Sequence, residues 1–113
     1  MERYGNDTHR ASLFPGKVVF MREKSIEAKL VAAVKAVGGV CWKFTSPGTA
    51  GVPDRIVLMP QGRIAFVEVK APGETPRPLQ RLRIKTLQRL GFKAFVLDSQ
   101  QQIGGIIDAI QTT

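Results

Sequence analysis

The sequence of 113 residues has only one cysteine, Cys41, and only one histidine, His9. A lone cysteine cannot form an intramolecular disulfide, and its isolation favours a reducing compartment. With so few thiol and imidazole groups, a zinc site or a Ser-His-Asp triad has almost nothing to be built from. Any catalytic chemistry must therefore use carboxylates, lysines and a metal ion that prefers oxygen ligands.

Long apolar runs are missing as well. No stretch approaches the roughly 18 residues of a membrane-spanning helix, and none has the pattern of a secretory signal. We therefore expect a cytoplasmic protein with no membrane partner. The hydrophobic fraction of 43% is ordinary for a globular chain, and the length suits one domain with a core of its own.

Acidic residues are few compared with basic ones. Nine Asp and Glu residues stand against 17 Lys and Arg residues, which leaves a formal net charge of +8. An excess of this size on a small domain favours polyanionic partners, and nucleic acid is a better candidate than an anionic membrane. The composition by itself predicts a polyanionic partner but does not indicate which kind.

What the sequence does contain is a pattern typical of an α/β domain. Residues 1–20 have no clear hydrophobic period, so we predict a partly disordered N-terminal extension, with disorder through about residue 12, and a single domain over residues 21–113. Hydrophobic spacing and turn residues predict a helix over 23–37, strands over 40–45, 56–59 and 63–69, a helix over 78–90, a strand over 93–97 and a closing helix over 100–110. This α-β-β-β-α-β-α order predicts a mixed four-stranded sheet flanked by helices.

A turn between two of these strands determines which side chains face each other. The segment 60–62, Pro-Gln-Gly, suits a three-residue hairpin loop, because proline fixes the first residue in a helical conformation and glycine tolerates a left-handed third. In that register Asp54 lies opposite Glu68, with Cβ atoms about 5 Å apart on one face of the sheet. Strand alternation brings Lys70 to the same face.

Two opposed carboxylates repel each other unless a cation lies between them. Mg²⁺ or Mn²⁺ would suit this place, because hard ions prefer carboxylate oxygens. Lys70 would then orient or help to deprotonate a metal-bound water, the nucleophile that hydrolysis needs. The alternative is a solvated hairpin end, in which Asp54 caps the turn and Glu68 pairs with Lys70 at the surface. The register of Asp54, which follows Gly-x-Pro, favours the metal site.

These residues resemble a known family. Pro53-Asp54 followed by Glu68-x-Lys70 is similar to the motif of the PD-(D/E)xK nuclease superfamily, and the wider pattern resembles its virus-type replication-repair nuclease (VRR-NUC) group. The resemblance covers about residues 22–99 and includes GGVCWKFTSPGTAGVPDRIVL, GRIAFVEVKAPGETPRPLQ and LGFKAFVLDS. It implies a restriction-endonuclease-like core.

The resemblance also implies a role for each matching position. Asp54 and Glu68 would bind the metal ion, and the backbone carbonyl of Val69 would be an additional ligand. Lys70 would be the catalytic lysine. Gln80, near the start of the second long helix, would position the nucleophile or the phosphate.

On the first helix, the resemblance implies that Glu27 reaches the metal directly or through water. Glu23, one turn earlier, could exchange roles with it. We favour Glu27 because it shares a face with Leu30 and Val34, which should point toward the sheet; the alternative is a solvated helix residue. Arg55, beside the first acid of the motif, should point to the other face of the sheet and serve the structure.

The second long helix carries charge of one sign. Basic residues recur along it, and we interpret them as phosphate contacts because an ordinary solvated face usually mixes acids with bases. They are Arg77, Arg81, Lys85 and Arg89. The opposite, apolar side of the helix is expected to hold Leu79, Leu82, Leu87 and Leu90.

Five further positions give weaker signals. Gly48 and Gly51 would let their loop approach a nucleic-acid backbone, or would merely serve its turn. Arg83 falls among the leucines by helical spacing, and reaches either a buried acid or the active-site groove. Trp42, with Phe44 on the same side of its strand, is expected to pack in the core rather than to stack on bases.

Together these observations predict a metal-dependent, structure-selective DNA endonuclease. The resemblance implies that it cleaves four-way (Holliday) junctions as a homodimer, in DNA repair and in a phage or bacterial setting. A twofold dimer suits a junction because both offer two symmetric sites. The alternatives are a non-catalytic nucleic-acid-binding module with the same fold, and a nuclease that acts on flap DNA or RNA.

Overall fold

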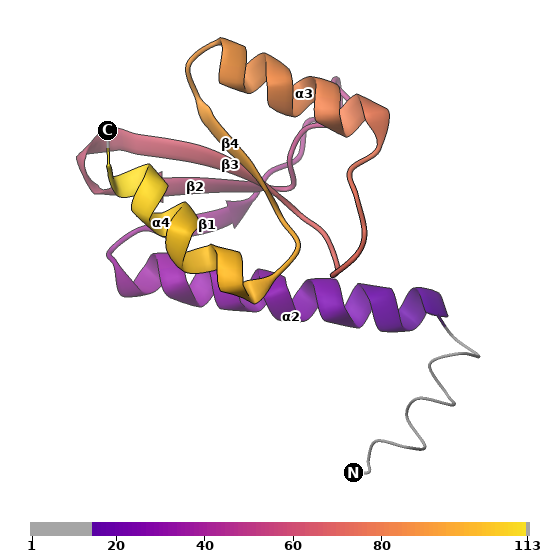
Figure 1. The fold of residues 1–113 in the computed structure, drawn as a ribbon. Helices are drawn as coiled ribbons and strands as arrows, with labels where there is room; N and C mark the ends of the chain where they lie inside the picture. The colour runs from indigo at the N-terminus through magenta and orange to yellow at the C-terminus, as the bar shows by residue number, and fades with distance from the viewer. Residues whose placement is uncertain (1–14, 113) are drawn as a thin grey trace.

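The computed structural model describes residues 15–112 and confirms the predicted α/β class (Figure 1). Its elements follow the predicted order. They are α2 (Pro15–Ala36), β1 (Val40–Lys43), β2 (Arg55–Met59), β3 (Arg63–Val69), α3 (Pro78–Arg89), β4 (Lys93–Leu97) and α4 (Ile103–Gln111), with 3₁₀ turns at Pro60–Gly62 and Gln100–Gln102. Among the described residues no helix is both long and apolar enough to cross a bilayer.

The four strands form one mixed sheet in the order β1-β2-β3-β4. β1, β2 and β3 are antiparallel neighbours, whereas β4 runs parallel to β3. The predicted register of the hairpin is confirmed, since Met59 pairs with Arg63 and Ile56 pairs with Phe66. The turn differs from its prediction in one detail: Gln61 is left-handed as well as Gly62, with φ of 69° and 74°.

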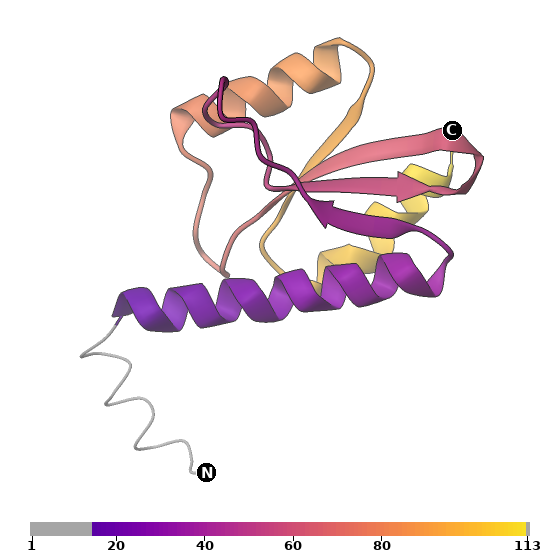
Figure 2. The same cartoon turned by 180° about the vertical axis from the view of Figure 1, so that it is seen from behind.

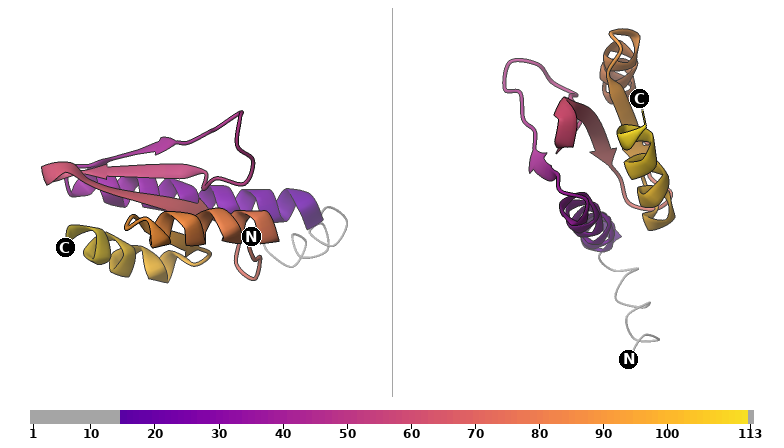
Figure 3. Two further views of the ribbon diagram at one scale, coloured as in Figure 1. Left: turned by 90° about the horizontal axis from the view of Figure 1, so that it is seen from above. Right: turned by 90° about the vertical axis from the view of Figure 1, so that its left-hand side faces the viewer.

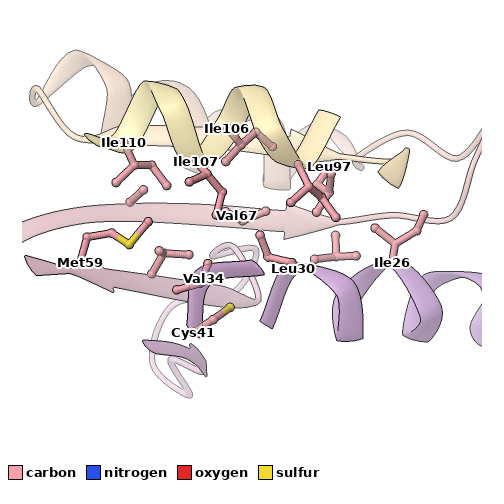
Figure 4. Close-up of a cluster of buried hydrophobic side chains, with 14 residues drawn as sticks. Ile26, Leu30, Val34, Cys41, Met59, Val67, Leu97, Ile106, Ile107 and Ile110 are labelled. Atoms are coloured by element: carbon pink, nitrogen blue, oxygen red, sulfur yellow. The ribbon is translucent and has the colours of Figure 1, made fainter. Parts of the chain in front are cut away.

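The helices cover the two faces of the sheet unequally (Figures 1 and 2). α2 and α4 pack on one face, where Leu30, Val57, Val67 and Ile110 belong to the main buried cluster (Figure 4). On the other face α3 forms a smaller cluster around Phe66. Figure 3 shows that α3 lies on the β4 side of the sheet, so the described helices leave β1 uncovered on this face.

α2 begins at Pro15, earlier than predicted, and runs through residues that the sequence analysis assigned to the extension. Proline fits the first turn of a helix, because no intrahelical bond needs its missing N–H. Gly38 has a φ of 89°, and the Gly39 amide donates to the Val34 carbonyl, so the helix ends where predicted. The predicted disorder through about residue 12 lies outside the described residues.

Two predictions about apolar side chains are wrong. Trp42 is 58% exposed, because β1 is an edge strand and α3 does not reach it. In α3, Leu82 and Leu90 are also exposed, while Ile84 is buried and Leu87 packs beside it. The apolar side of α3 is thus rotated from the predicted row of leucines toward Ile84.

Candidate active site

The two predicted acids lie at the same end of the hairpin. The ladder that pairs Arg55 with Val67 and Ile56 with Phe66 sets Asp54 opposite Glu68, one position further on. The Asp54 carboxylate accepts a hydrogen bond from the Val69 amide at 3.1 Å. The structure therefore brings the aspartate of one strand to the glutamate of the next.

Burial dominates the electrostatics of this pair. Desolvation first, and then the negative charge of Glu68, raise the pKa of Asp54 to about 7. Burial also raises the pKa of Glu68, although the neighbouring Lys70 ammonium opposes the change. Two carboxylates held this way favour a cation, because a cation stabilises their charged forms.

The two oxygens of Glu68 have different surroundings. Oε2 lies 3.3 Å from Lys70 Nζ and accepts a hydrogen bond from Gln80 Nε2 at 3.0 Å. Oε1 is buried and has no hydrogen-bond partner among the described residues. A buried oxygen without a partner costs about 1–3 kcal/mol, so this atom calls for a ligand.

The donor set fits a hard divalent ion better than a zinc ion. No cluster of three or more His, Cys, Asp and Glu side chains occurs within residues 15–112. Mg²⁺ and Mn²⁺ do not need one, because they are often held by one or two carboxylates and keep several waters. Asp54 and Glu68, with the unpartnered Oε1, therefore fit such an ion.

Gln80 reaches the site because of how α3 begins. Pro78 occupies the first turn, where it suits the helix. The Gln80 side chain accepts a hydrogen bond from the Arg77 amide at 2.8 Å and donates its amide N–H to Glu68. The residue that caps the helix therefore also orients the buried glutamate.

Glu27 is buried but does not contact the acid pair. Its carboxylate lies 2.9 Å from Arg55 Nε and 3.2 Å from Lys24 Nζ. Burial raises its pKa, but the hydrogen bonds and charges of Arg55 and Lys24 outweigh that effect and leave the pKa below its usual value. Arg55 points to the sheet face opposite the acid pair, as predicted, where it meets α2, and it also donates to the Cys41 carbonyl.

Both glutamates of α2 still act on the site through their charge. Glu27 and Glu23 each contribute to the raised pKa of Asp54. Glu23 also contributes to the raised pKa of Glu68. The structure thus places both α2 carboxylates within electrostatic range, and Glu23 influences both members of the acid pair.

The predicted nucleic-acid contacts divide into two groups. The basic residues of α3 are all exposed: Arg77, Arg81, Lys85 and Arg89. Gly48 is open, since nothing would lie within 4 Å of an added Cβ. Gly51 has a φ of 85° and lies directly against Leu79, which favours the turn interpretation for that residue.

Sequence reasoning missed two contacts that shape the site. The ion pair of Arg55 with Glu27 was not foreseen, because Glu27 had been assigned to the metal and Arg55 only to the sheet face opposite the acid pair. Arg83 reaches neither a buried acid nor the acid pair: its Nε donates to the Ala50 carbonyl at 2.8 Å. The one sequence signal for this contact was that helical spacing puts Arg83 among apolar positions rather than with the other basic residues of α3.

Comparisons with known proteins agree with this geometry. The family model of the VRR-NUC domain matches residues 15–101. A protein of Acyrthosiphon pisum secondary endosymbiont phage 1, named "Putative nuclease p44", is 50% identical over 90 residues, which are 80% of this chain and 96% of that protein. A solved VRR-NUC domain superposes with a TM-score of 0.72 at 30% identity, covering 77% of this chain and 95% of its own.

Proposed function

Since the chain belongs to the VRR-NUC family, we propose that it is a metal-dependent nuclease that hydrolyses phosphodiester bonds of DNA. One observation carries the proposal: Glu68, opposite Asp54, keeps a buried oxygen without a hydrogen-bond partner. Lys70 lies against the other oxygen of the same carboxylate. A purely structural ion pair would leave no reason to bury Oε1 in this way.

Each described residue of the site has a part in this chemistry. Asp54 and Glu68 would hold Mg²⁺ or Mn²⁺, which when bound stabilises negative charge on the phosphate and makes water a better nucleophile. Glu68 fixes the Lys70 ammonium, whose N–H groups would orient the attacking water. Gln80 holds Glu68 in place through its amide N–H. The Val69 carbonyl as a third ligand, and Glu27 or Glu23 as a further one, belong to the same proposal.

Charge supports nucleic acid as the substrate. The chain carries a net charge of +8, and α3 presents exposed basic side chains beside the residue that orients Glu68. Phosphate contacts of this kind position a substrate without reading its sequence. A nuclease that selects DNA by its shape fits such a surface better than one that selects a base sequence.

The decisive experiment is a cleavage series on gels. Four-way junction, flap, duplex and single-stranded DNA, and a single-stranded RNA, are each incubated with Mg²⁺, Mn²⁺ or EDTA. We expect cleavage with either metal and none with EDTA. Glu68→Ala and Lys70→Ala should lose cleavage but keep salt-sensitive binding. If the wild-type protein binds every substrate and cuts none with either metal, it is a binding module and the proposal is wrong.

We further propose that the protein cleaves four-way junctions as a homodimer. The uncovered apolar face, made of Val40, Trp42, Ile64 and Phe92, supports the dimer. Trp42 continues the Phe66 row onto the edge strand β1, Val40 and Ile64 lie in the next row, and Phe92 packs edge-on against Phe66. Two copies with a charge of +8 repel each other least when they meet through a surface that is apolar and uncharged.

The dimer is tested by placing a charge on this face. Ile64→Lys should turn a dimer into a monomer in sedimentation at micromolar concentration, and should abolish paired cuts in a junction. Leu82→Lys is the matched control, because Leu82 is also apolar and exposed but lies on α3 outside this face. A wild-type monomer that still cuts junctions symmetrically would disprove the homodimer.

A further inference from the structure

The loop between β1 and β2 leads directly into the acid pair. Its base is closed by the Phe44 amide, which donates to the Asp54 carbonyl at 2.9 Å. A turn follows in which the Thr49 amide donates to the Ser46 carbonyl. Pro53, immediately before the aspartate, is fully buried. The path of this loop therefore sets where the Asp54 carboxylate lies.

α3 holds the far side of the same loop at two adjacent residues. Arg83 Nε donates to the Ala50 carbonyl at 2.8 Å. At the next residue, Gly51, an added Cβ would lie 2.8 Å from Leu79 Cγ and 3.2 Å from the Leu79 carbonyl oxygen. The contact is close enough that only glycine fits, and the φ of 85° also favours glycine.

Arg83 differs from the other basic residues of its helix. Arg81, Lys85 and Arg89 are exposed, whereas Arg83 is half-buried. Burying part of a guanidinium is unfavourable unless it makes hydrogen bonds. Here the compensating hydrogen bond goes to a backbone carbonyl, which fixes a position on the loop without changing the charge of the site.

We infer that Arg83 is a positioning residue for Asp54, acting through the Ala50 carbonyl. One helix would then hold both acids: Gln80 orients Glu68 directly, and Arg83 orients Asp54 through the loop. The function assigned to Arg83 rests on the proposed nuclease activity. The structural part of the inference does not, because it concerns the position of a carboxylate in the metal-free protein.

Amide hydrogen exchange tests that structural part without metal or substrate. The Val69 amide reports on the Asp54 side chain, and the Phe44 amide reports on the base of the loop. In Arg83→Gln both should exchange about fivefold faster, the factor that corresponds to a lost hydrogen bond worth about 1 kcal/mol. Arg81→Gln removes the same charge from an exposed position and should change neither amide.

Two further variants separate the loop contact from the arginine itself. Gly51→Ala pushes the loop away from Leu79 of α3, and should accelerate amide exchange at Val69 although Arg83 is intact. Arg83→Lys keeps a donor and should recover part of the wild-type protection. Unchanged exchange at Val69 in Arg83→Gln, with an unaltered melting temperature, would overturn the inference.

Metal affinity tests whether the contact of Arg83 with the Ala50 carbonyl affects metal binding at Asp54. In calorimetric titration with Mn²⁺, Arg83→Gln should bind about fivefold more weakly than wild type if a hydrogen bond worth about 1 kcal/mol preorganises the aspartate. Equal affinity would reject the role in metal binding. A wild-type protein that binds no Mn²⁺ would contradict the proposed function while leaving the exchange result to decide the positioning role.

Discussion

At the scale of single residues, the site consists of a buried glutamate and a half-buried aspartate, whose charged forms are disfavoured before any ion is bound. Asp54 has a pKa of about 7, and the pKa of Glu68 is raised in the same direction. The folded metal-free protein therefore holds protons that the unfolded chain has already released. The free energy of unfolding must fall as the pH rises across this range.

The first prediction concerns this pH dependence. From about pH 4 to about pH 7 the metal-free protein should lose stability, because Asp54 is protonated in the folded state and ionised in the unfolded one over that window. Urea unfolding at a series of pH values measures the effect. Asp54→Asn should flatten the profile and stabilise the metal-free protein at about pH 8 by about 2 kcal/mol.

Asp108→Asn is the matched control, because Asp108 is exposed and should leave the pH profile as in wild type. Mg²⁺ at about pH 8 should raise the melting temperature of the wild-type protein and not that of Asp54→Asn. If Asp54→Asn keeps the full wild-type slope, the pH dependence arises elsewhere in the chain.

At the scale of elements, the hairpin could be predicted in detail and the helix contacts could not. The Pro60–Gly62 turn sets a register that pairs Asp54 with Glu68, and such a register follows from local chemistry. Trp42 and Leu82 were predicted wrongly because their exposure depends on where α3 lies over the sheet. That placement depends on packing between distant segments, which periodicity does not encode.

The same limit explains why the burial of Glu27 was predicted but its partner was not. Its spacing with Leu30 and Val34 correctly predicted a buried side chain. It did not predict that Arg55, on a strand far along the sequence, would be the group that it meets. Helical period predicts that Glu27 is buried and strand alternation predicts the face on which Arg55 lies, but that these two residues meet requires the three-dimensional arrangement.

The second prediction concerns this link between α2 and β2. Arg55→Met should destabilise the protein by about 3 kcal/mol, because it leaves Glu27 buried without its main partner. The double variant Glu27→Gln with Arg55→Met should recover much of that loss, since no uncompensated charge remains. Urea unfolding of the four proteins in a double-mutant cycle measures the coupling. A loss no larger than that of an exposed substitution would show that Glu27 finds another cation.

At the scale of the whole molecule, the charge is distributed to suit a polyanion. The net charge of +8 is large for 113 residues, and the acids that do occur include the pair at the site. Exposed bases on α3 continue outward from Gln80, the residue that touches Glu68. The substrate is therefore expected to lie along α3 with a phosphate at the acid pair.

The third prediction measures this surface through salt. Replacing Arg81, Lys85 and Arg89 together by Gln should reduce the slope of log K against log salt by about 2–3 if each side chain contacts one phosphate of double-stranded DNA. Fluorescence anisotropy with one duplex in EDTA gives the slope without cleavage. Lys35→Gln, an exposed residue near the end of α2, is the single-site control. An unchanged slope in the triple variant would place the phosphates elsewhere.

The arms of the β2–β3 hairpin limit how this chain can change in length during evolution. Adding one residue to either arm would turn its carboxylate toward α2, and removing two would displace it by about 7 Å. Only paired changes at the 60–62 tip leave the acids facing each other. Insertions and deletions tolerated in this hairpin should therefore be symmetric and confined to its far end.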